Sequence, residues 1–123
     1  MIQDRSLVVI ADNTGAKIGR IFKVVGSSKK RYARIGDLVV LSVQIAEPRK
    51  SVKKKEVLQA VVVRQRAPFK RKDGSVIRFD ENAVVILEKD KKEPKAGRIF
   101  GPIPRELSEL GYQTIISRAP EVV

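Results

Sequence analysis

The chain has 123 residues, of which 42% are hydrophobic and 33% are charged, a composition that fits one globular domain and excludes a disordered chain. Its 26 Lys and Arg residues outnumber its 14 Asp and Glu residues, and the formal net charge of +12 favours an anionic partner such as RNA, DNA or an acidic membrane surface. Cys is absent, which excludes disulfides and thiolate metal sites, and the absence of His removes the commonest general base and metal ligand. An enzyme is therefore the less favoured class.

The apolar runs are too short to cross a bilayer, because a spanning helix needs roughly 20 apolar residues. The first six residues contain no basic segment followed by an apolar one, and Asp4 is atypical of a transit peptide. We expect the mature chain to start at Met1 and to remain in the reducing compartment where it is made.

The first half of the chain alternates short apolar runs with turn signals. Asp12 and Asn13 can bond their own backbone and Gly15 permits positive φ, so a tight turn is predicted there. A second turn is predicted at Gly36. Apolar and β-branched residues between the turns predict strands at residues 6–11, 18–25 and 38–45.

Residues 60–80 predict a hairpin with a basic tip. Pro68 cannot donate to a ladder, so the first strand should end before it, and Asp73-Gly74 is a strong turn signal. The expected strands of the second half are 57–63 and 76–79, with 83–87 either a sixth short strand or a continuation of the fifth.

A short helix is predicted at residues 105–111, with Pro104 in its first turn, Leu107 and Leu110 on one face and Gly111 just past its end. Residues 114–116 are apolar and should pack against the rest. Five or six evenly spaced strands with one late helix predict a mainly β fold, a small barrel or sandwich with a helical C-terminal appendage.

Three basic clusters, at residues 29–34, 49–55 and 64–78, hold fifteen of the 26 cations. All three fall at predicted strand ends, so we expect them to converge on one side of the barrel and to bind phosphate. Tyr32 either stacks on a base within its cluster or covers the edge of the core. The chain has no recognition helix, zinc pattern or basic zipper, which favours RNA over duplex DNA.

A carboxylate-dependent nuclease is the catalytic alternative, with Asp12, Asp37, Asp73, Asp80 and Glu81 as its candidate residues. The first three lie in or beside Gly-containing turns, where Asp is common for backbone reasons alone. No Gly-rich phosphate loop is present. We therefore expect no enzymatic activity.

Six segments together resemble one known family over the whole chain. In order and spacing they are similar to large-subunit ribosomal protein fourteen of bacterial or organellar type: residues 11–17 (ADNTGAK), 31–33 (RYA) with 36–37 (GD), 60–64 (AVVVR), 73–80 (DGSVIRFD) with 82–83 (NA), 98–102 (RIFGP) with 105–107 (REL), and 119–122 (APEV).

The resemblance implies one domain, with a closed five-stranded β-barrel over residues 1–100 and a short helical region over 101–123. It implies a structural, cofactor-free constituent of the large ribosomal subunit that binds large-subunit rRNA and bridges to small-subunit rRNA. The implied protein contacts are large-subunit proteins three and nineteen and a ribosome-silencing factor near Arg98. The implied location is the cytoplasmic ribosome, or an organellar matrix or stroma. A free-standing RNA-binding module or assembly chaperone of barrel type is the alternative.

The candidate residues follow from the clusters and the resemblance together. The expected rRNA-binding residues are Lys17, Lys29, Lys30, Arg31, Tyr32, Arg34, Arg49, Lys50, Lys53, Lys54, Lys55, Arg64, Arg66, Lys70, Arg71, Lys72 and Arg78. The expected intersubunit and silencing-factor face comprises Arg98, Phe100 and Arg105. No metal ligands are expected. Charge reversal at Arg64, Arg66 and Arg71 should weaken rRNA binding and leave the barrel folded.

The chain departs from the family pattern at four positions. Lys50 and Lys55 stand where the family usually has Gly, and because lysine resists positive φ, a different turn is predicted between the third and fourth strands. Gly97 and Thr114 are departures at the silencing-factor face.

Overall fold

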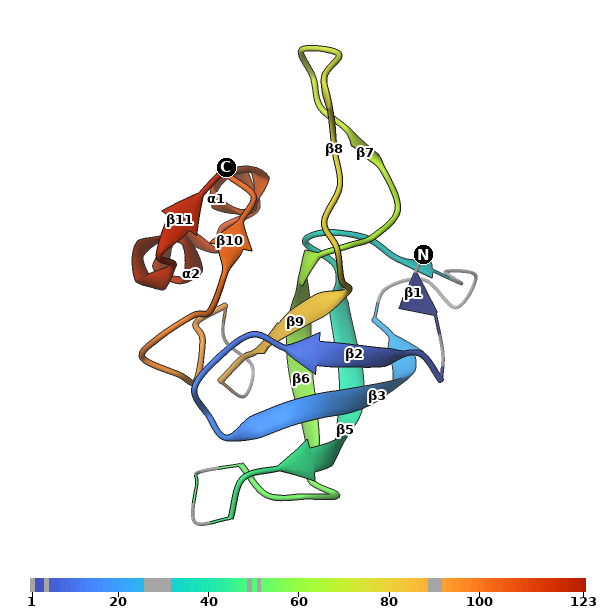
Figure 1. Ribbon diagram of the computed structural model, residues 1–123, viewed down its shortest axis with the longest axis vertical. Coiled ribbons are helices and arrows are strands. Elements are labelled where there is room, and N and C mark those ends of the chain that lie inside the picture. The colour runs from blue at the N-terminus through green and yellow to red at the C-terminus, as the bar shows by residue number, and fades with distance from the viewer. Residues whose placement is uncertain (1, 4, 26–31, 49, 51, 89–91) are drawn as a thin grey trace.

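The fold was examined in a computed structural model that describes residues 2–3, 5–25, 32–48, 50, 52–88 and 92–123 (Figure 1). It is mainly β, as the sequence predicts. The elements in chain order are β1 (Ile2–Gln3), β2 (Leu7–Ile10), β3 (Ala16–Val24), β4 (Tyr32–Ala33), β5 (Leu38–Ala46), β6 (Val57–Arg64), β7 (Phe69–Lys70), β8 (Val76–Ile77), β9 (Ala83–Ile86), β10 (Pro102–Ile103), α1 (Glu106–Glu109), α2 (Gln113–Arg118) and β11 (Glu121–Val122).

Five strands, β2, β3, β5, β6 and β9, close into a barrel in that order (Figure 1). Neighbouring strands are antiparallel, except that β2 and β9 close the barrel as a parallel pair. The four strands predicted at residues 6–11, 18–25, 38–45 and 57–63 are all confirmed to within a few residues. Closure leaves no free edge in this sheet.

The apolar residues form two cores on the two faces of the barrel wall. Inside the barrel lie side chains of every strand, among them Val8, Ile21, Leu41, Val62 and Ile86. The second core lies outside, where the outer faces of β6 and β9 meet the C-terminal segment. It contains Val61, Val63, Val85, Ile99, Ile103, Leu107 and Ile115. The unbroken apolar run of β6 follows from this arrangement, because its second half is buried on both faces.

The hairpin at residues 60–80 is paired differently from the prediction. β6 pairs with β9, with Val61 opposite Val85, so residues 83–87 supply the fifth barrel strand. The predicted strand at 76–79 is only β8, which pairs with β7 in a separate two-stranded ribbon that projects beyond the barrel (Figure 1). The ribbon is detached from the barrel because the polar stretch before Pro68 ends β6.

The predicted turn at the tip of the ribbon is confirmed. Gly74 has φ +90°, and Asp73 Oδ1 accepts hydrogen bonds from the backbone N–H and the hydroxyl of Ser75, at 2.9 and 2.6 Å. These hydrogen bonds lower the pKa of Asp73.

The C-terminal segment contains the predicted helix and one that the sequence did not reveal. α1 buries Leu107 completely and is followed by Gly111 at φ +95°, as predicted, but Leu110 is 46% exposed and does not share the buried face. Residues 114–116 do pack, within α2, whose Ile115 is buried. Tyr112 at the start of α2 provides no side-chain cap, so tertiary packing holds this helix. Neither described helix is long and apolar enough to cross a membrane.

Candidate nucleic-acid interface

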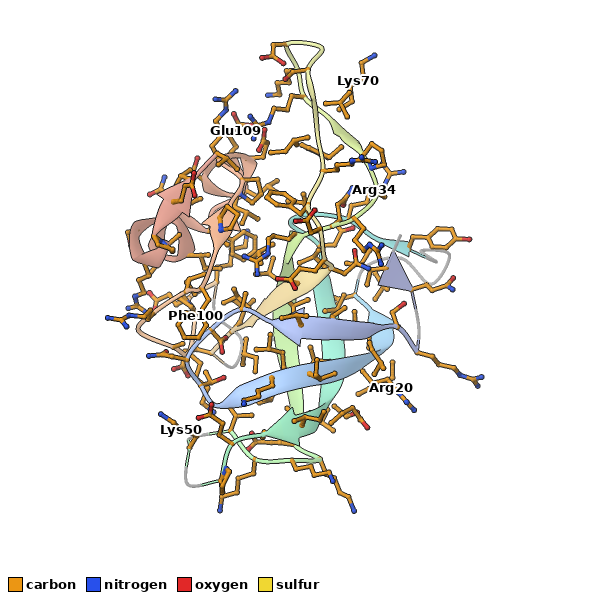
Figure 2. All side chains as sticks on the ribbon, in the orientation of Figure 1. Arg20, Arg34, Lys50, Lys70, Phe100 and Glu109 are labelled. Atoms are coloured by element: carbon orange, nitrogen blue, oxygen red, sulfur yellow. The ribbon has the colours of Figure 1, made fainter. Side chains whose placement is uncertain are left out.

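Four cations on or beside the β7–β8 ribbon are exposed: Arg66, Lys70, Lys72 and Arg78. Lys72 Nζ lies 3.6 Å from Glu109 Oε2, but its side chain is 93% exposed, so the pair leaves it available to solvent anions. Figure 2 shows Lys70 directed away from the barrel. The ribbon therefore presents concentrated positive charge.

Arg64 does not belong to this exposed set, and its contact with rRNA stays a prediction that its burial disfavours. The residue is 5% exposed. Its Nη1 donates to the carbonyl oxygens of Phe100, at 2.8 Å, and Pro102, at 3.1 Å, and its Nη2 donates to Glu81 Oε1 at 3.0 Å. Gly101 makes this possible, because a Cβ there would lie 2.5 Å from Arg64 Nη1. Arg64 joins the barrel wall to the C-terminal segment.

Arg71 also has an internal role. Its Nε lies 2.6 Å from Glu106 Oε1, and its Nη2 donates to the carbonyl oxygen of Val123 at 2.7 Å. The side chain is 12% exposed, so Glu106 neutralises most of the charge that it would offer to phosphate. Arg71 fastens the base of the ribbon to α1. Against the expectation from the sequence, we therefore expect charge reversal at Arg64 and Arg71 to destabilise the fold, because carboxylates there would face carbonyl oxygens and Glu106.

A second group of exposed cations lies at the opposite end of β6, in the connection from β5. It comprises Lys50, Lys53, Lys54 and Lys55. The labelled Lys50 and Lys70 lie at opposite ends of the molecule (Figure 2). The predicted convergence of the basic clusters on one side is therefore wrong for these two clusters. Lys17 lies on β3 and pairs with Glu47 at 3.6 Å, with both side chains largely exposed.

The turn that contains Lys55 keeps left-handed geometry. Lys55 has φ +69°, and its backbone N–H donates to the carbonyl oxygen of Val43 at 2.7 Å. Lysine therefore adopts positive φ at this position. This hydrogen bond to β5 holds the backbone of the turn in a conformation that lysine alone disfavours.

Part of the first basic cluster can be placed. Lys29, Lys30 and Arg31, with Arg49 from the second cluster, lie outside the described residues. Tyr32 lies on β4 and is 45% exposed, so much of its ring is accessible for stacking. Arg34 is exposed, and its backbone N–H donates to Asp37 Oδ2 at 2.8 Å.

The residues of the expected intersubunit face occupy two places. Arg98 and Phe100 are both exposed, and backbone hydrogen bonds fix them beside the turn after β2: Asn13 N–H donates to the Arg98 carbonyl, and Phe100 N–H donates to the Ala11 carbonyl at 2.9 Å. Sequence reasoning missed Asn13, whose Oδ1 also accepts from Arg98 N–H at 3.3 Å. Arg105 instead lines a hollow of about 400 Å³ between the ribbon and α1.

Three of the candidate catalytic carboxylates have internal partners: Asp12 and Asp73 accept hydrogen bonds from nearby residues, and Glu81 pairs with Arg64. Asp12 is 3% exposed and accepts hydrogen bonds from the hydroxyl of Thr14 at 2.6 Å, from its backbone N–H and from Ile86 N–H. Burial raises the pKa of Asp12, although these hydrogen bonds oppose the shift. Among the residues that the structure describes, no group of Asp and Glu could hold a metal ion. The arrangement offers anion binding by separated lysines and arginines.

Comparison with known families gives one finding for the whole chain. The model of the family described as ribosomal protein L14p/L23e matches residues 1–123.

Proposed function

Because the chain belongs to the ribosomal protein L14p/L23e family and is thus a structural constituent of the large ribosomal subunit, we propose that it binds large-subunit rRNA through exposed cations at both ends of its barrel. Association with rRNA and with other ribosomal proteins is general to the family. Its exposed basic surfaces carry this role, and no catalytic role is proposed for the chain.

The separation of the two exposed basic groups is the observation that supports this proposal. Lys70 and Lys72 lie on the ribbon that follows β6, and Lys53 and Lys54 precede β6 at its other end. A rigid, closed barrel between two cationic ends can hold two RNA segments at a fixed distance. Each exposed lysine neutralises phosphate without reading bases, so shape and backbone govern recognition.

The surface around Arg98 and Phe100 is the proposed intersubunit face. Phe100 is exposed beside a cation and is fixed by the hydrogen bond to Ala11, which suits contact with small-subunit rRNA or a silencing factor. Contacts with large-subunit proteins three and nineteen belong to the same proposal, as does a place on cytoplasmic or organellar ribosomes.

We also propose that the barrel and residues 101–123 act as one domain. The second core contains Val61 and Val85 from the barrel together with Ile103 and Leu107 from the C-terminal segment. Neither part can bury these side chains alone.

The test compares a ribbon variant with a charge-conserving control. Arg66→Glu, Lys70→Glu and Lys72→Glu should together weaken binding to large-subunit rRNA and lower the log–log salt slope by about 0.7 to 0.9 for each phosphate that is no longer neutralised. Arg66→Lys, Lys70→Arg and Lys72→Arg should retain both the affinity and the slope. Equal affinities for the two variants would contradict the role of the ribbon.

A second experiment separates the structural role from that of an assembly chaperone. The native chain should remain with mature large subunits during sedimentation through a high-salt sucrose gradient. A chain found only on immature particles would favour the chaperone.

A further inference from the structure

One side of the barrel wall is left uncovered by the C-terminal segment. The second core covers the outer faces of β6 and β9, whereas the outer face of β3 and its neighbours carries exposed apolar side chains. Leu7 on β2, Phe22 on β3 and Ile45 on β5 all belong to this group. Phe22 is the one aromatic residue among them, and it is 48% exposed.

A β-bulge sets the orientation of Phe22. The register of β3 against β5 shifts between Ile21, opposite Leu41, and Lys23, opposite Val40. The extra residue places Phe22 and Lys23 on the outside together, while Ile21 and Val24 on either side are buried. Strict alternation would bury Lys23 and expose Val24. Bulges of this kind are found where a strand redirects a side chain toward a ligand.

Three exposed cations lie on or beside this stretch of β3. Arg20 and Lys23 are exposed on the same strand, and Figure 2 shows Arg20 directed away from the barrel. Arg5 is exposed as well, and its backbone N–H donates to the Ile21 carbonyl at 2.6 Å, which brings a third cation to this part of β3. Within the described barrel strands there is no Asp or Glu.

We propose that Phe22 is a stacking platform for an unpaired RNA base, with Arg20 and Lys23 contacting the phosphates on either side. The inference rests on the proposed rRNA binding and adds a third contact surface, on the side of the barrel between the two basic ends. An exposed aromatic ring with three exposed cations on or beside its strand matches single-stranded RNA, in which stacking and phosphate neutralisation occur side by side. Protein partners instead favour mixed charge around an apolar centre.

The test uses two fluorescent probes of equal length and charge, an oligouridine RNA and an abasic RNA. Phe22→Ala should weaken binding of the oligouridine by about 5- to 150-fold, the range for loss of one base–aromatic stack, and leave binding of the abasic probe unchanged. Phe22→Tyr should restore the affinity because its ring also stacks. Arg20→Gln with Lys23→Gln should lower the salt slope for both probes, by about 0.7 for each phosphate that the two cations neutralise.

Val57→Ala is the matched control, since Val57 is an exposed apolar residue on β6, two strands from Phe22 in the barrel, and it should leave both affinities unchanged. Thermal unfolding verifies that each variant is folded. Unchanged oligouridine binding by Phe22→Ala would overturn the stacking role, while loss of rRNA binding in the ribbon variant would still uphold the proposed function. Failure of the unsubstituted chain to bind either probe or rRNA would overturn both. Loss of incorporation into subunits by Phe22→Ala at unchanged RNA affinity would assign this surface to a protein and refute the inference.

Discussion

Removal of the Arg64 guanidinium tests whether this residue stabilises the fold. In Arg64→Ala, the carbonyl oxygens of Phe100 and Pro102 lose a charged donor, and hydrogen bonds of that kind contribute about 1.5–3 kcal/mol each. The ion pair with Glu81 adds only about 0–1 kcal/mol, because the Glu81 side chain is 47% exposed. Water that enters the vacated space offsets part of the loss. The expected fall in the free energy of unfolding is therefore about 2–4 kcal/mol.

Urea denaturation measures this difference directly. Arg66→Ala is the control, because the Arg66 side chain is exposed. This variant should change the free energy of unfolding by less than about 0.5 kcal/mol. Arg64→Lys should be intermediate, since an ammonium group cannot reach all three acceptors. A loss below about 1 kcal/mol in Arg64→Ala would refute the assignment of Arg64 as a structural tie.

Three further substitutions test other parts of the fold. Leu107→Ala should lower the free energy of unfolding by about 2–5 kcal/mol because Leu107 is fully buried. Leu110→Ala should lower it by less than about 1 kcal/mol, because Leu110 is exposed. Equal losses in urea denaturation would contradict the assigned helix face. Lys55→Gly should raise the free energy of unfolding by up to about 1 kcal/mol, since relief of the left-handed backbone strain exceeds the entropy that glycine loses on folding. Lys54→Gly, at a position without positive φ, should not raise it. Destabilisation by Lys55→Gly would refute the strain at Lys55. Because burial raises the pKa of Asp12 above 3.8, the folded state holds its proton more tightly, so its contribution is complete below pH 3.8 and is lost as pH rises through the raised pKa. The stability of the unsubstituted chain relative to Asp12→Asn should fall over that window in melts at several pH values, and an opposite slope would contradict the shift.

The sequence predicted the strands that are buried enough to form uninterrupted apolar runs. It did not predict the features that depend on which strands pair or on how distant segments pack. Residues 60–63 are apolar without a break because β6 is buried on both faces. Residues 76–79 and residues 83–86 were both candidates for the strand that pairs with β6. Only residues 83–86, as β9, pair with it, and no short-range signal in the sequence distinguishes the two segments. α2 was missed because its β-branched residues and uncapped start favour a helix only when Ile115 is buried.

The candidate site shows the same division. Lys70 and Lys72 could be identified from charge density alone, and both are exposed. Arg64 could not, because its two carbonyl acceptors lie more than thirty residues away in sequence. The separation of the second and third clusters could have been inferred, since they lie at the two ends of one strand, β6. Phe22 gave no signal, because the bulge that exposes it depends on the register with β5.

The parallel pairing of β2 with β9 determines the order in which this chain can fold. Val9 on β2 lies opposite Ala83 on β9, so the barrel cannot close until β9 has been synthesised. During synthesis β2, β3, β5 and β6 can form only an open sheet, with one unpaired edge on β2 and another on β6. Such edges pair readily with other chains, and contacts this distant in sequence form slowly.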